Sequence, residues 1–276
     1  MDEKTASAPG RRASARDAKR SARAAQAGHS VPYITRRIPV YEVLDEEGLA
    51  LIERNADTIL EEIGIEFRED PEALAIWKAA GADVEGERVR MPRGLCRRLI
   101  QATAPRQFTQ HARNPARSVE IGGSHTVFAP AYGSPFVYDL DQGRRYAGIE
   151  DFRNFVKLAY VTTSLHHSGG TICEPVDLPV NKRHFDMVYS HMKYSDKCFM
   201  GSVTHPERAA DTVEMAKILF GGEWLDPASG KPKTCIVSLI NVNSPMTYDA
   251  TMLGALKVYA RANQACTRGP VVDSRK

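Results

Sequence analysis

Five side chains that can contact or transform a ligand follow directly after predicted strands: Tyr132, Glu174, His205, Asn241 and Asn243. In parallel α/β folds, functional side chains lie at the carboxyl ends of the strands, so these residues form the candidate site. Glu174 is the candidate catalytic residue, because a carboxylate can act as a general base or face a cationic ligand. The other four are candidate substrate-binding residues, with Tyr132 offering the face of its ring to a cation.

Each of these side chains also has a purely structural interpretation. Asn241 and Asn243 can turn the chain and cap the next helix, and His205 can be a helix-capping residue. Glu174 can be a solvated surface carboxylate, and Tyr132 can simply pack against its neighbours. The sequence leaves both interpretations open for all five.

The sequence lacks the signatures of metal and nucleotide sites. His166 and His167 follow a predicted helix, where a cation interacts favourably with the helix dipole, and His184 and His191 lie two helical turns apart, too far to chelate one ion. No Gly-x-Gly-x-x-Gly, Walker or Gly-x-Ser-x-Gly motif occurs. The five cysteines are widely spaced and form no Cys-x-x-Cys pair, so we expect free, buried thiols. We therefore expect no metal and no directly bound cofactor.

Residues 234–244 carry the strongest strand signal in the chain, a mostly apolar and β-branched run that ends in polar residues and a proline. With the strand period of two, Val237 and Leu239 share one face with Asn241 and Asn243. That face is apolar for most of its length and presents two amides at its end. This pattern is typical of a buried parallel strand that delivers side chains to a site.

Helices and short apolar strands alternate from residue 149 onward, at about 25 to 40 residues per unit, which indicates right-handed βαβ crossovers and a parallel sheet with helices on one face. Four parallel strands are expected, at residues 126–129, 171–174, 198–203 and 234–243. After Gln264 a fifth apolar strand should follow, but residues 265–276 contain few apolar side chains. We therefore interpret 118–264 as one unit and 265–276 as an aberrant tail.

The N-terminal third divides into two parts. Residues 1–30 are mainly Ala, Arg, Ser and Gly, and residues 1–37 have a net charge of +6, so we predict a disordered basic tail over 1–30. Residues 31–117 predict a small α+β region. Its expected elements are a helix over about 45–63, a strand at 65–67, a helix over 70–80, a hairpin at 84–91 and a helix from 92.

The composition narrows the protein class. The chain has 276 residues and 42% hydrophobic content, enough for a sizeable core. It has no apolar run near the roughly 18 residues that a membrane span needs and no secretory segment, so we expect a cytoplasmic protein without membrane contact. The sequence favours a solvated basic tail over a nucleic-acid contact, and no specific nucleic-acid partner is expected.

Several short segments, in order and at similar spacing, resemble the trimethylamine methyltransferase family. These segments are 104–108 (APRQF), 111–115 (HARNP), 135–141 (PFVYDLD), 150–152 (EDF) and 240–245 (INVNSP). The resemblance implies a (β/α)8 (TIM) barrel, of which this chain would form about four βα units preceded by the α+β region. It also implies methyl transfer from a methylated amine, such as trimethylamine or a betaine, to the cobalt of a separate corrinoid protein. The corrinoid, a cobalamin, would be carried by that partner.

The resemblance covers only the N-terminal half of the family pattern, because family chains are about twice as long. We therefore expect a truncated half barrel with open edges and an uncovered apolar inner face, prone to aggregation or homo-oligomerisation and inactive alone. Two alternatives differ in kind. One is a non-catalytic remnant that binds a partner, and the other is a small-molecule-binding α/β domain with a doubly wound sheet.

Overall fold

The computed structural model of the chain describes residues 31–241 and 246–267. Its N-terminal region confirms the predicted order of elements, and the capping residues explain where the helices begin: Asp45 accepts a hydrogen bond from the Gly48 amide at 2.8 Å, and Asp70 accepts one from the Ala73 amide at 3.0 Å. The elements are β1 (Ile34–Thr35), α2 (Glu46–Thr58), the π-helical turn η1 (Ile59–Ile63), β2 (Ile65–Phe67), α3 (Pro71–Ala79), β3 (Asp83–Glu85), β4 (Arg88–Arg90) and α4 (Leu95–Thr103).

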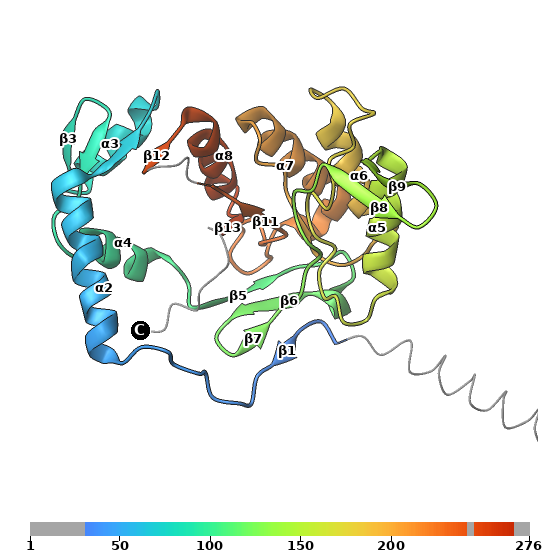
Figure 1. The fold of residues 1–276 in the computed structure, drawn as a ribbon, viewed down its shortest axis with the longest axis horizontal. Coiled ribbons are helices and arrows are strands. Elements are labelled where there is room, and N and C mark those ends of the chain that lie inside the picture. The colour runs from blue at the N-terminus through green and yellow to red at the C-terminus, as the bar shows by residue number, and fades with distance from the viewer. Residues whose placement is uncertain (1–30, 242–245, 268–276) are drawn as a thin grey trace, which may run out of the picture.

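The central and C-terminal parts contain two antiparallel hairpins, β5–β6 and β8–β9, followed by alternating helices and short strands. Figure 1 shows α2 and α4 on one side of the molecule, α5 and α6 on the other, and β11 between them. The elements are β5 (Gln107–Gln110), β6 (Val119–Gly122), β7 (His125–Thr126), β8 (Phe136–Asp139), β9 (Gly143–Tyr146), α5 (Ile149–Val161), α6 (Arg183–Tyr194), β10 (Phe199–Met200), α7 (Pro206–Phe220), β11 (Ile236–Leu239), β12 (Thr247–Tyr248), α8 (Ala250–Arg261) and β13 (Ala265–Thr267), with 3₁₀ turns η2 (Pro115–Arg117) and η3 (Gly221–Trp224). In the described part of the chain, every helix is too short or too polar to cross a bilayer.

A parallel sheet of three strands, in the order β10-β11-β13, forms the centre of the α/β part. Helices α7 and α8 connect these strands, so neighbours in the chain are neighbours in the sheet. An irregular segment continues the same order beside β10, because the amide of Ser168 donates to Cys198 O and the amide of Met200 donates to Gly169 O, both at 2.8 Å. The described strands have no switch point of the kind that defines a doubly wound sheet.

The predicted partial barrel is not confirmed, because the described residues form several small sheets and no closed barrel. Two predicted strands are wrong in detail. At 126–129 only Thr126 is in a strand, β7, which runs antiparallel to β1. Beyond it, the Phe128 amide donates to His166 Nδ1 at 2.9 Å, and Phe128 O accepts the amides of His166 and His167. At 171–174 there is only an isolated parallel bridge between Ser134 and Cys173, preceded by Gly169 at a φ of +90°.

The expectation that the strand pattern ends at Gln264 is also wrong. Ala265–Thr267 form β13, which pairs in parallel with β11 and covers the edge that we expected to be free. The Gln264 side chain links the two strands just before this pairing, because its Oε1 accepts hydrogen bonds from the amides of Cys235 at 2.9 Å and Ile236 at 2.8 Å. The strand is short and contains one Ala, one Cys and one Thr, so its composition gave almost no strand signal.

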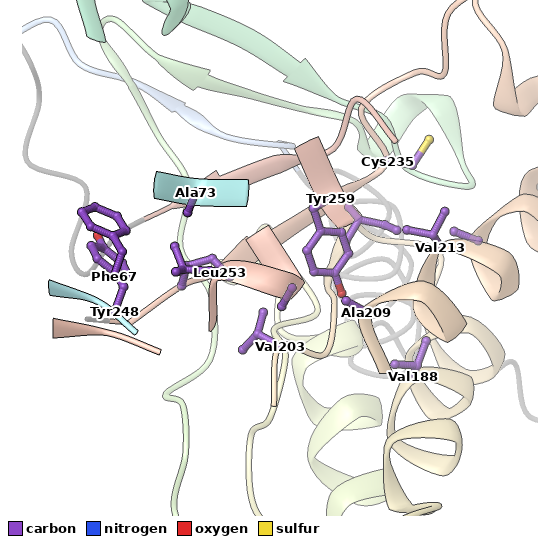
Figure 2. Close-up of a cluster of buried hydrophobic side chains, with 14 of the residues drawn as sticks. Phe67, Ala73, Val188, Val203, Ala209, Val213, Cys235, Tyr248, Leu253 and Tyr259 are labelled. Carbon is purple, nitrogen blue, oxygen red and sulfur yellow. The ribbon is translucent and has the colours of Figure 1, made fainter. Parts of the chain in front are cut away.

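One hydrophobic core joins the N-terminal region to the parallel layer. It contains Phe67 of β2 and Tyr248 of β12, whose rings stack with centroids 5.4 Å apart, and it extends to Tyr259 of α8 and Val213 of α7 (Figure 2). Strand β12 pairs in parallel with β2, which gives a four-stranded sheet in the order β12-β2-β4-β3. The segment that follows β11 therefore returns to the N-terminal region.

Candidate functional site

An open hollow of about 660 Å³ lies on the inner side of the parallel layer. Val237 and Leu239 of β11 both line it, as the strand period of two predicts, whereas Ile236 and Ser238, on the other face of the strand, do not. The β5–β7 segment supplies further lining residues, and the rest of the lining comes from Arg36, Val127, Ala129, Tyr132, His167, Met200 and Thr267. A cavity of this size can hold a small organic ligand.

Gln110 of β5 closes one side of the hollow against the parallel strands. It is fully buried, and its amide nitrogen donates to the carbonyls of Phe199 at 2.9 Å and Cys235 at 3.2 Å. Its Oε1 lies 3.2 Å from His167 Nε2, so this ring nitrogen carries the proton and donates to it. His167 Nδ1 accepts from the Gly169 amide at 2.9 Å. The network therefore fixes His167 as a neutral imidazole bordering the hollow.

A second buried imidazole lies close by. His191 Nε2 donates to Gly170 O at 2.8 Å, and Nδ1 accepts from the Ser168 hydroxyl at 2.7 Å. Burial lowers the pKa of His191 to about 4. Burial, together with the nearby His191 and Lys197, lowers the pKa of His167 to about 3. Both rings are thus neutral near pH 7 and act as hydrogen-bonding groups of the scaffold.

Tyr132 is the predicted site residue that the structure places in the hollow. Its side chain is partly exposed and lies against Gly170, where an added Cβ would come within 2.8 Å of both Tyr132 Cε2 and Met200 Cβ. The missing side chain of Gly170 lets the aromatic ring and the thioether approach each other. Tyr132, Met200 and Gly170 thus form a small apolar surface with one aromatic ring, the kind of surface that a methylated ammonium group prefers.

Glu174, the predicted catalytic residue, lies outside the lining of the hollow. Its carboxylate accepts a hydrogen bond from Arg183 Nη1 at 3.0 Å, and Arg183 Nη2 donates to Leu178 O at the same distance. The backbone amide of Glu174 donates to Ser134 O, so the residue is anchored beside the segment that carries Tyr132. Its carboxylate is half-buried and held by a guanidinium.

His205 and Asn241 do not join Tyr132. His205 is the N-cap of α7, where its Nδ1 accepts weakly from the Glu207 amide at 3.4 Å, as its structural interpretation predicts. Asn241 is exposed directly after β11 and does not line the hollow. Asn243 lies outside the described residues. Of the four predicted side chains that the structure describes, one, Tyr132, lines the hollow.

Sequence reasoning missed the polar network of Gln110 and His167. The two residues are 57 positions apart, and Gln110 is 89 positions from its acceptor Phe199, so no local spacing could reveal them. All five cysteines are free, as expected, and burial raises the pKa of Cys198 and Cys235 to about 12, which makes these thiols unreactive. Within residues 31–241 and 246–267, no cluster of three or more metal-ligating side chains is found.

Comparison with known proteins gives consistent matches. The sequence model of the trimethylamine methyltransferase family matches residues 10–274. A glycine betaine methyltransferase of Desulfitobacterium hafniense (strain Y51) is 49% identical over 228 residues, which cover 83% of this chain and 46% of that relative. A proline betaine:corrinoid methyltransferase of Eubacterium limosum is 28% identical over 176 residues, which cover 63% of this chain and 35% of that relative. The chain thus spans less than half the length of each of these relatives.

Proposed function

Because the chain belongs to the trimethylamine methyltransferase family, we propose that it serves in the transfer of a methyl group from a methylated amine to a corrinoid protein. The names of the two relatives, which act on glycine betaine and proline betaine, support a betaine-like quaternary amine as the substrate. We also propose that the parallel segments belong to a (β/α)8 barrel, because strands adjacent in the chain are adjacent in the sheet.

The observation that carries this proposal is the aromatic and apolar surface formed by Tyr132, Met200 and Gly170 at the edge of the hollow. A trimethylammonium group is a large cation with a weakly hydrated, apolar surface, and it binds to aromatic faces by cation–π attraction. Tyr132 is the proposed contact for this group. His205, Asn241 and Asn243 remain proposed substrate contacts on the strength of their positions after strands.

The chemistry of the step explains what these side chains need to do. The reduced cobalt of the corrinoid, carried by the partner protein, supplies the nucleophile. The C–N bond breaks, its electron pair stays on nitrogen, and a quaternary substrate leaves as a neutral tertiary amine. No proton has to move in this step, so the chemistry does not require Glu174 to act as a general base. Its carboxylate lies outside the lining of the hollow and pairs with Arg183, and its proposed role is to attract the cationic substrate towards the hollow.

Ligand binding tests this proposal directly. Glycine betaine should bind to the purified chain, and Tyr132→Leu should weaken binding roughly tenfold, because loss of a desolvated cation–π contact costs about 1–2 kcal/mol. Isothermal titration calorimetry measures both constants. Tyr138→Leu is the matched control, since this tyrosine of β8 is 75% exposed and does not line the hollow.

Equal affinity of the parent and Tyr132→Leu proteins would contradict the proposed contact. Binding without methyl transfer to reduced cobalamin or a corrinoid protein would favour the alternative, a non-catalytic binding protein. The corrinoid partner and a homo-oligomeric state remain proposals, which the transfer assay and size-exclusion chromatography respectively test. A cytoplasmic location also remains a proposal.

A further inference from the structure

A small cavity lies between α6 and the ends of the central strands, apart from the large hollow. Its volume is about 20 Å³, and its lining includes His184 and Val188 of α6 together with Gly170, Thr171 and Ser202. A cavity needs roughly 10–15 Å³ to hold a water molecule and about twice that for the share of one molecule in the liquid. This partly open cavity therefore has room for a water molecule.

His184 has one ring nitrogen with a partner and one without. Its Nε2 lies 2.9 Å from Asp211 Oδ2, and because a carboxylate only accepts, this nitrogen carries the proton. In the neutral ring, Nδ1 is then an acceptor. The residue is only 5% exposed, and among the described residues no hydrogen-bond partner reaches the buried Nδ1.

The neighbouring polar groups cannot supply the missing hydrogen bond directly. Both nitrogens of His191 are already engaged, one with the Ser168 hydroxyl and one with Gly170 O. Thr171 and Ser202 bring hydroxyl groups to the lining, so a molecule in the cavity would have further polar neighbours. Leaving a buried acceptor unsatisfied costs about 1–3 kcal/mol, which a single bridging water would relieve.

We propose that this cavity binds one water molecule, which donates a hydrogen bond to His184 Nδ1. Asp211, His184 and the water then form a continuous hydrogen-bonded chain between α7, α6 and the strand ends. Met200 borders both this cavity and the large hollow, so Met200 separates the water from the proposed substrate-binding surface. The inference depends on the contacts of His184 and is independent of the proposed methyl transfer.

A crystal structure of the chain, at a resolution that shows ordered waters, tests the site. We expect density for one water about 2.7–3.2 Å from His184 Nδ1. An ordered His184 ring beside an empty cavity, or a protein atom bonded to Nδ1, would overturn the proposal.

A double-mutant cycle tests the same site in solution. Val188→Ile adds one methyl group to a buried residue of the lining. His184→Leu removes the Nδ1 acceptor, and water can replace its hydrogen bond to Asp211, whose side chain is 39% exposed. If water occupies the cavity, Val188→Ile displaces it and should lower Tm by about 2–6 °C in the parent, but by clearly less in the background of the His184→Leu variant. A rise in Tm in both backgrounds would show a dry cavity, and an equal fall would show a purely steric effect. Either result would overturn the proposal.

Discussion

At the scale of single residues, the two buried imidazoles make stability depend on pH. His167 and His191 have a pKa lowered by burial from 6.5 to about 3 and about 4, so the unfolded chain binds more protons than the folded chain below pH 6.5. Stability should therefore fall as pH falls from about 6.5 to about 4, by about 1.4 kcal/mol per pH unit for each ring. Urea unfolding at about pH 7 and about pH 5 measures this slope.

The variant His191→Gln should remove the part of the slope that comes from this ring, about 1.4 kcal/mol per pH unit, whatever its effect on stability at neutral pH. Val156→Ala is the control, because it truncates a fully buried apolar residue near Phe152, whose ring contacts His191, without removing a titrating group. Parallel pH profiles of the parent and the His191→Gln protein would show that His191 is not held neutral.

Single residues also show how far the sequence predicts the site. The period-two pattern placed Val237 and Leu239 correctly in one wall. Tyr132 also lines the hollow, but the predicted parallel strand before it does not form. The same positional argument cannot tell a ligand contact from a helix cap, and His205 is a cap in the structure. Gln110 gave no signal, because its role arises only when β5 meets strands far away in the sequence.

At the scale of elements, the end of α5 depends on a lysine from another segment. Lys197 is buried, and its ammonium group donates to three carbonyls at this end, those of Ala159 at 2.7 Å, Thr162 at 3.1 Å and Leu165 at 2.7 Å. A cation at the carboxyl end of a helix also interacts favourably with the helix dipole. Burial, with some repulsion from Arg117, lowers the pKa of Lys197 to about 8, so the group is still mostly charged at pH 7.

Replacing this lysine tests the importance of the contact. Lys197→Met keeps most of the side-chain volume but leaves the three carbonyls without their donor, and we expect a loss of about 2–4 kcal/mol in the free energy of unfolding. Lys157→Met, an exposed position on the same helix, should change it by less than about 1 kcal/mol. Similar unfolding midpoints in urea for the two variants would contradict the capping role.

The composition also predicted some elements better than others. The alternation of helices and strands correctly predicted a parallel sheet built in chain order, because amphipathic helices must cover one face of it. Strand lengths and ends were less predictable. The Phe128 amide donates to the His166 ring, and Gln264 Oε1 accepts the Cys235 amide beside β11, the partner of β13. Contacts between residues far apart in the sequence therefore decide what the local sequence leaves open.

At the scale of the whole molecule, α8 and α3 join the parallel layer to the N-terminal region through charged groups as well as the shared core. Lys257 Nζ donates to Asp70 Oδ1 at 2.7 Å and to Glu72 Oε2 at 2.9 Å, and Arg261 pairs with Glu72. Asp70 is only 5% exposed and also caps α3. Removal of the lysine would leave this buried carboxylate without its cation, which is the costly way to break an ion pair.

Lys257→Met should therefore lower the free energy of unfolding by about 2 kcal/mol, a value reduced because the Lys257 side chain is 23% exposed. The matched control is Lys217→Met, which breaks an exposed pair with Glu214 within α7 and should cost less than about 0.5 kcal/mol. Because one core spans both parts, fluorescence and circular dichroism should report the same single unfolding transition of the parent protein.

If the ion pairs are needed to hold the parts together, the N-terminal region of Lys257→Met will unfold first, and the transitions reported by fluorescence and by circular dichroism will separate. Coincident transitions at the parent midpoint would instead show that the Phe67–Tyr248 core alone joins the two parts.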